Sequence, residues 1–292
     1  MDGSYKVKKL VAIAAVIMLA GTSLAVFAQA DSPLTGADIL DLMQETGSLF
    51  GEDTDAVFTT RFDFVYSDGT EGSNEFTFLA KQGDEELGEP DYLLIYYQAP
   101  ADIEGTLFLT HSLPDAEDRL WLFLPALGLV KELVSEGEKE QSFGGTNLTL
   151  GQIGGGFDYS DDYDAERLGD ETVTATFDGE ALERVVYVLG LTARPDRDTD
   201  YVEGVLWVDA EELLPLRTEF YSELGNLEVT LDVLDLQTFD GDLTPTWIES
   251  QDIIDESKTT IRVLDQRRIE LAVQVFDPEN LPSFDLASIL AE

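Results

Sequence analysis

Short stretches that alternate apolar and polar residues make up most of this sequence after residue 55. In the first of them, Phe58, Phe62 and Phe64 fall on one face, whereas Arg61 and Asp63 fall on the other. This period of two is typical of a half-buried β-strand. The same pattern predicts further strands over Ser73–Gln82, Asp91–Gln98, Gly105–His111, Arg119–Leu124, Leu129–Val134, Thr172–Asp178, Leu182–Leu191, Tyr201–Asp209, Leu213–Ser222, Asn226–Phe239, Pro245–Asp252, Lys258–Leu264 and Ile269–Phe276. Turns of Gly, Asp and Asn join the stretches, so a mainly β protein built as an antiparallel meander is predicted.

Two stretches depart from the strand pattern. Thr35–Phe50 carries apolar residues at helical spacing and acidic residues in its first turns, which predicts an amphipathic helix. Leu148–Ile153 predicts a short helix, with Gly144-Gly145 before it and Gly154-Gly155-Gly156 after it. These glycines are suited to turns, and they would also suit the hinges of a flap.

The first thirty residues have the layout of a secretory signal peptide. Three lysines precede an apolar run from Leu10 to Ala20, and the triplet Ala28-Gln29-Ala30 predicts cleavage before Asp31. The alternative is an uncleaved anchor, because Leu24–Phe27 nearly extends the apolar run to a membrane-spanning length. We expect residues 1–30 to be the signal peptide and residues 31–292 to form one domain of an exported protein.

Charge excludes several classes of partner. Acidic residues outnumber basic ones by 60 to 17, which gives a net charge of -43. Such a chain repels phosphates, so nucleic acid is excluded, and any lipid must be held by its tails instead of an anionic headgroup. Self-repulsion destabilises the compact state unless salt screens it, which favours a saline environment over an ordinary acidic exported protein. The chain contains no cysteine, so it is not itself lipidated at a cysteine.

Residues for catalysis are sparse. His111 is the only histidine and ends a predicted strand, and no serine or acidic residue is spaced as in a nucleophile elbow. Phosphate-binding and dinucleotide-binding fingerprints are missing, so no cofactor is expected. Oxygen ligands suited to calcium cluster at Asp158, Asp161, Asp162 and Asp164. Their spacing is not that of an EF-hand, and in so acidic a chain such a cluster also arises from composition alone.

Two predicted strands are apolar on both faces. Tyr92–Tyr97 and Leu120–Leu124 contain only aliphatic and aromatic residues. Such a strand either lies in a two-layered core or lines a second apolar surface, and the sequence leaves both open. If there is a groove, the side chains expected to line it are Phe62, Phe64, Tyr96, Trp121 and Phe123.

A set of ordered segments is more specific than the strand pattern. The segments are Pro100–Thr106, Asp118–Gly128, Ser142–Gly145, Asp158-Tyr159, Trp207–Asp209, Leu213–Arg217 and Thr244-Pro245. In their order and spacing they resemble the outer-membrane lipoprotein-sorting family, specifically its LolA-like branch. The resemblance implies an open, strongly curved antiparallel sheet, an incomplete β-barrel like those of LolA and LolB, with an N-terminal helix and short helical lid segments. Gly144, Asn147, Leu150 and Gln152 depart from the residues that the family usually has.

The resemblance also implies a function. It is that of a non-enzymatic periplasmic carrier, which binds lipoprotein or lipid acyl chains in an apolar groove and works with an inner-membrane transporter. One alternative is a calcium-dependent lipid hydrolase that uses the same groove and the acidic cluster up to Glu166. Another is a non-enzymatic accessory scaffold of a membrane transporter. A carrier is expected to hold bound lipid without turning it over, and a hydrolase is expected to release a product only when the metal is present. A scaffold is expected to show neither bound lipid nor product.

Overall fold

The computed structural model describes residues 34–46, 55–83, 88–113, 116, 118–155, 159–195, 197, 199–239 and 242–291. The strands are β1 (Ala56–Val65), β2 (Glu71–Lys81), β3 (Asp91–Ala99), β4 (Leu107–Ser112), β5 (Arg119–Leu124), β6 (Leu129–Leu133), β7 (Tyr163–Phe177), β8 (Glu180–Ala193), β9 (Glu203–Asp209), β10 (Pro215–Tyr221), β11 (Leu227–Phe239), β12 (Asp242–Asp252) and β13 (Ser257–Arg268). The helices are α1 (Gly36–Thr46), α2 (Glu136–Lys139), α3 (Leu150–Gly155), α4 (Tyr159–Asp162), the 3-10 helices η2 (Val273–Phe276) and η3 (Pro278–Ser283), and α5 (Leu286–Ile289).

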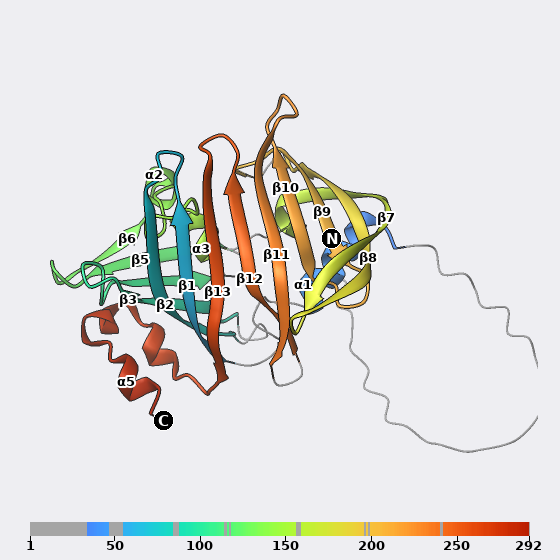
Figure 1. Cartoon of the computed structure of the whole chain (residues 1–292). Coiled ribbons are helices and arrows are strands. Elements are labelled where there is room, and N and C mark those ends of the chain that lie inside the picture. Colours follow the sequence, from blue (N-terminus) through green and yellow to red (C-terminus); the bar gives the residue numbers. More distant parts are fainter. Residues whose placement is uncertain are drawn as a thin grey trace, which may run out of the picture. The chain divides into compact units, whose positions relative to one another are not determined.

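These thirteen strands form one large curved sheet that is not closed into a barrel (Figure 1). Its order is β10-β9-β8-β7-β11-β12-β13-β1-β2-β3-β4-β5-β6. Most strands pair antiparallel with their neighbours in sequence, which confirms the predicted mainly β, antiparallel architecture. Two pairings go beyond a meander: β13 pairs with β1, and β11 pairs in parallel with β7 where Leu236 lies opposite Phe177.

The register fixes which residues share a face, because directly opposed residues in an antiparallel pair point to the same side. Phe58 on β1 opposes Phe78 on β2, and Phe62 lies on the same side of β1. We call this side the inner face. The outer face carries Val57 and Leu79, which also oppose each other.

The chain covers both faces of the strands that are apolar on both sides. On the inner face, residues 142–155, which we call the covering segment, bury Phe143 and Leu148 against β1–β5. On the outer face, residues 269–291, which we call the C-terminal segment, bury Phe276 and Leu281 against β3–β5. Figure 1 shows the C-terminal segment in red, folded back beside the strands of the first half. Strands β3 and β5 therefore lie between two layers formed by the same chain.

The strand predicted over Ile269–Phe276 is wrong. β13 ends at Arg268, opposite the first residue of β1, so the ladder between these strands stops there. The chain then turns toward the outer face, where the N–H of Leu271 donates to the carboxylate of Asp55 at 2.6 Å. Val273–Phe276 forms a 3-10 helix instead of a strand, because Phe276 and Val275 pack against the sheet without a partner strand, whereas Val273 is exposed.

The two predicted helices are present with shifted bounds. α1 begins one residue after Thr35, and residues 47–50 of the predicted helix lie outside the described part of the chain. α3 begins two residues later than predicted, because Thr149 and Gln152 exchange hydrogen bonds of 3.1 Å in the manner of a capping box.

The predicted signal peptide and its cleavage site also lie outside the described residues. Within the described part, none of the helices has the length and hydrophobicity needed to cross a membrane.

Candidate functional site

Phe143 of the covering segment lies at the centre of an aromatic cluster on the inner face. The centroid of its ring is 4.7 Å from that of Phe76, 5.4 Å from Tyr97, 5.7 Å from Phe62 and 6.4 Å from Phe108. All five side chains are buried, and burial raises the pKa of the Tyr97 hydroxyl, which therefore stays neutral. Aromatic pairs at such separations contribute about 0.5–1.5 kcal/mol each beyond area burial, so they hold the covering segment on the sheet.

Two glycines shape the turn that follows Phe143. Gly144 and Gly145 have φ angles of +59° and +83°, in the left-handed region that favours glycine. The amide of Asn74 donates to the carbonyl of Gly144, and the hydroxyl of Tyr66 donates to that of Gly145. Side chains near the end of the β1–β2 hairpin thus hold the turn by donating hydrogen bonds to the backbone carbonyls of Gly144 and Gly145.

Asn147 holds the middle of the covering segment over β12 and β13. Its backbone N–H donates to Thr259 Oγ1 at 3.2 Å, and its side-chain amide donates to Ser250 Oγ at 3.3 Å. Both partners are almost completely buried. These two hydrogen bonds attach the middle of the covering segment to β13 and β12.

α3 seals the end of the cluster that lies over β4. A Cβ added to Gly154 would be 2.8 Å from Thr110 Oγ1 and 2.9 Å from Phe108 Cζ. These separations are too short for a real Cβ contact. Glycine therefore allows the backbone of α3 to pack directly on the side chains of β4.

Two of the five predicted groove residues lie on the inner face. Phe62 belongs to the aromatic cluster around Phe143. Phe64 follows on the same side of β1, but its ring lies against the backbone of Gly72, where a Cβ would be only 2.1 Å from Phe64 Cζ. The structure therefore brings Phe62 into the cluster and places Phe64 at the end of the strand.

The other three predicted groove residues lie on the outer face. Tyr96, Trp121 and Phe123 belong to the cluster beneath the C-terminal segment, where the ring of Tyr96 stacks on that of Phe284 with centroids 5.7 Å apart. No single groove is therefore lined by all five residues. Phe143 also belongs to the inner-face cluster, although the sequence analysis did not select it. Its position directly before two glycines is the sequence feature that could have indicated an aromatic residue held against the sheet by a turn.

His111 has a structural role at the outer face. Its ring lies between those of Tyr92 and Trp121, with centroid distances of 4.8 and 4.6 Å, and its Nε2 bonds to the carbonyl of Phe276 at 2.8 Å. Burial lowers the pKa of the imidazole, although the bond to the carbonyl acts in the opposite direction. The histidine thus connects β4 to the C-terminal segment.

The predicted calcium ligands do not form a described metal site. Asp158 lies outside the described residues, and Asp161 and Asp162 end α4. Asp164 lies on β7 and forms an exposed ion pair of 3.2 Å with Arg194. Within the described part of the chain, no three acidic or histidine side chains are grouped so that they could hold a metal ion.

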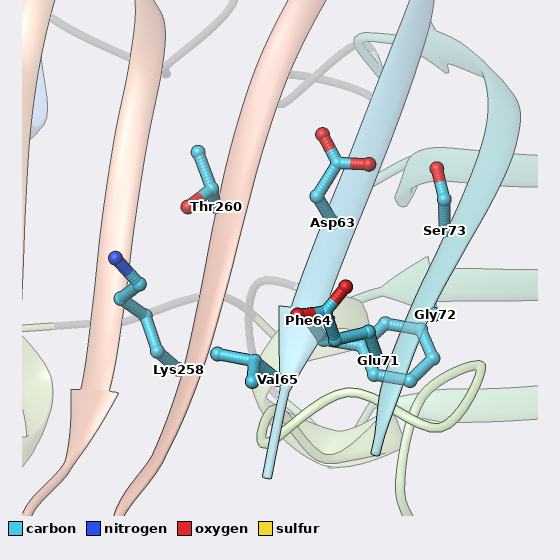
Figure 2. Close-up of a pocket in the computed structure, with 8 residues that line it drawn as sticks. All are labelled: Asp63, Phe64, Val65, Glu71, Gly72, Ser73, Lys258 and Thr260. Carbon is cyan, nitrogen blue, oxygen red and sulfur yellow. The ribbon is translucent and has the colours of Figure 1, made fainter. Parts of the chain in front are cut away.

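A depression of about 490 Å³ lies on the outer face where β13, β1 and β2 meet (Figure 2). Asp63 opposes both Ser73 and Thr260, so these three side chains point into it from neighbouring strands. Glu71 and Lys258 add two charges to the lining. Phe64 and Val65 also line this depression, but Phe143 and the four sheet rings around it do not, so it is separate from the aromatic cluster.

Comparison with known proteins identifies the family. A family model described as an uncharacterized protein matches residues 89–283, about two thirds of the chain. The solved structure of a DUF1329 family protein from Desulfovibrio piger ATCC 29098 is 26% identical, covers 84% of this chain and 97% of its own, and has a TM-score of 0.73. The chain belongs to the DUF1329 family. Among proteins with curated descriptions, none matches this DUF1329 protein.

Two further structures share this fold. An outer membrane lipoprotein-sorting protein domain from Vibrio parahaemolyticus is 24% identical, with a TM-score of 0.69, and the match covers 85% of this chain and 98% of that domain. A LolA superfamily protein from Nitrosomonas europaea is 22% identical, with a TM-score of 0.61, and the match covers 84% and 98%. The LolA-like fold implied by the sequence resemblance is therefore confirmed.

Proposed function

We propose that this DUF1329 protein is a periplasmic carrier that binds the acyl chains of lipids or lipoproteins on the inner face of its sheet. The aromatic cluster around Phe143 carries the proposal. Four of its rings, on Phe62, Phe76, Tyr97 and Phe108, belong to the sheet, and the fifth belongs to the covering segment. Displacement of that segment would leave a continuous apolar surface of the kind that an acyl chain fits. The LolA-like fold supports this assignment.

The covering segment has the properties of a removable cover. The contacts of Asn74, Tyr66 and Asn147 with the covering segment are hydrogen bonds between neutral groups, whereas Gln152 at its exposed end donates to the carboxylate of Asp200 at 2.8 Å. Each of the neutral bonds contributes about 0.5–1.5 kcal/mol, because water replaces the partner when the bond opens. A bound acyl chain would restore apolar burial at about 25 cal/mol per Å², which offsets the loss of the contacts of Phe143.

The charge of the chain specifies how cargo is recognised. The residues of the aromatic cluster carry no charge, whereas the chain as a whole has a net charge of -43. Anionic headgroups are repelled, so affinity arises from the tails of neutral or zwitterionic cargo. We assign no catalytic step to the protein, and a membrane transporter is the partner from which it would receive its cargo.

Mass spectrometry of organic extracts tests the proposal. The exported protein is purified without detergent, and its extract is compared with that of an unrelated exported protein from the same cells. Lipid or lipoprotein in about equal molar amount, recovered unhydrolysed, is the expected result. A product released only with calcium would favour the hydrolase instead. An extract without lipid, from a protein that also fails to bind a fluorescent acyl probe, would favour the scaffold.

A further inference from the structure

Thr110 presents a buried hydroxyl to the apolar inner face. It opposes Leu93 on β3 and Leu120 on β5, both of which pack in the cluster around Phe143. Its side chain is 1% exposed, and Oγ1 has no hydrogen-bond partner among the described residues. The backbone of Gly154 in α3 closes over this hydroxyl. The covered state therefore keeps a polar group in apolar surroundings beneath the part of the chain that we propose to move.

A buried hydroxyl without a partner is unfavourable, and native proteins nearly always pair such groups. Valine has almost the same shape and lacks the hydroxyl, so it would suit this position better in the covered state. Two other threonines, Thr60 and Thr77, also have unpaired buried hydroxyls. Thr60 lies at a bulge in the pairing of β1 with β13, and Thr77 lies on the outer face, opposite Tyr96. Thr110 is the one that lies in regular pairing on the inner face.

We propose that the hydroxyl of Thr110 donates a hydrogen bond to an ester carbonyl of the bound lipid, so that the inner face selects ester-linked acyl chains over simple hydrocarbon chains. The inference rests on the proposed carrier function and specifies its ligand. A carbonyl oxygen accepts from a hydroxyl at about 2.7 Å and needs no charge to do so. When α3 leaves, Thr110 becomes accessible from the inner face, and the carbonyl supplies the partner that the covered state lacks.

A matched pair of ligands isolates the carbonyl. Short-chain diacyl phosphatidylcholine and the dialkyl ether analogue with the same chains differ in their ester carbonyls and share their zwitterionic headgroup. Both are used below their micelle concentrations, and affinity is measured by displacement of a fluorescent alkyl probe from the full exported protein. We expect the wild type to prefer the ester about five- to tenfold, as one hydrogen bond in an apolar site would give.

Two variants isolate the hydroxyl. Thr110→Val is expected to lose the preference for the ester while its affinity for the ether changes less than about twofold. Thr77→Val is the control, because Thr77 is also 1% exposed and unpaired but lies on the outer face. It should keep the full preference. Both variants should unfold at or above the wild-type temperature, since each removes an unpaired hydroxyl.

Three outcomes would overturn the inference. Equal binding of ester and ether by the wild type would do so, as would a preference that survives in Thr110→Val or is lost equally in Thr77→Val. Failure of the wild type to bind either lipid would instead contradict the carrier function itself. A diacylglyceryl-cysteine peptide and its dialkyl ether analogue distinguish the source of the carbonyl once the phosphatidylcholine pair has shown a preference. A larger preference with the peptide pair assigns the carbonyl to a lipoprotein, and an equal preference assigns it to glycerol esters in general.

Discussion

The ring of Phe143 lies tilted against the ring of Phe76, with centroids 4.7 Å apart and an interplanar angle of 37°. One ring belongs to the covering segment and the other to the sheet, so the same contact stabilises the empty protein and occupies the proposed binding surface. Stability and ligand affinity are therefore expected to change in opposite directions when this contact is weakened.

Replacement of Phe143 by alanine tests this opposition. The free energy of unfolding should fall by about 3–5 kcal/mol, because a fully buried phenylalanine is truncated. Affinity for a fluorescent acyl probe should rise, because the cover is held less tightly. Phe276→Ala is the control, since Phe276 is equally buried but lies on the outer face. Urea denaturation and probe titration check both values; an equal gain in affinity in the two variants would contradict the role of Phe143.

A disulfide across the cover tests whether it must move. The chain has no cysteine, so Asn147→Cys combined with Ser250→Cys introduces the only possible bond, at positions whose side chains now meet at 3.3 Å. The oxidised protein should bind no acyl probe, and reduction should restore binding. Asn147→Cys alone should not respond to the reductant. Probe binding by protein whose bond has been verified by thiol titration would show that the cover need not open.

Two glycines of α3 are expected to respond oppositely to alanine. Gly154→Ala places a methyl group against Thr110 and Phe108, so it should lower the free energy of unfolding by about 1–3 kcal/mol. Gly151→Ala meets Lys139 Cβ at 3.5 Å, an ordinary contact, and should raise it by up to about 1 kcal/mol through helix propensity. Urea denaturation distinguishes the two, and a loss of stability in both would mean that α3 packs differently.

Stability should depend on pH through His111. Burial lowers the pKa of this residue in the folded state, so the unfolded state binds more protons between the two pKa values. The free energy of unfolding should therefore decrease as the pH falls through about 6.5, where the unfolded histidine titrates. His111 is the only histidine, so His111→Phe should remove this slope. Chemical denaturation at intervals from pH 8 to pH 5.5 measures it, and an unchanged slope in the variant would exclude His111 as the cause.

Salt should stabilise the protein. With a net charge of -43, repulsion acts over about 10 Å at 0.1 M salt and about 3 Å at 1 M. The midpoint of thermal unfolding should rise between these concentrations, and an uncharged osmolyte at the same osmolality should raise it less. A flat or falling midpoint would show that the charges are already compensated in the fold.

The strands could be predicted because each one is indicated by the residue types within its own short stretch of sequence. β5 has the predicted bounds, Arg119–Leu124, because its run of adjacent aliphatic and aromatic residues is itself a local signal. The face of each residue was not predictable, because it depends on partners far away in the sequence. Phe62 and Trp121 look equivalent in the sequence, but the register places them on opposite faces, under the covering segment and the C-terminal segment respectively.

The cover itself could be predicted only in part. The glycines around Leu148–Ile153 correctly indicated a break in the sheet, and Gly144 and Gly145 do adopt conformations that favour glycine. The position of Phe143 in an aromatic cluster depends on Phe76, Tyr97 and Phe108, which come from three other strands. The C-terminal segment was missed for the same reason: its residues alternate like a strand, but its partner is an apolar surface.

The pairing of β1 with β13 has a consequence for the time at which the protein can fold. Ala56 pairs with Arg268, so one side of the first strand stays open until residue 268 has been synthesised. Contacts of such long sequence separation form slowly, because a large loop must close before they contribute. A growing chain therefore cannot complete its sheet before Ser257–Arg268 has been synthesised.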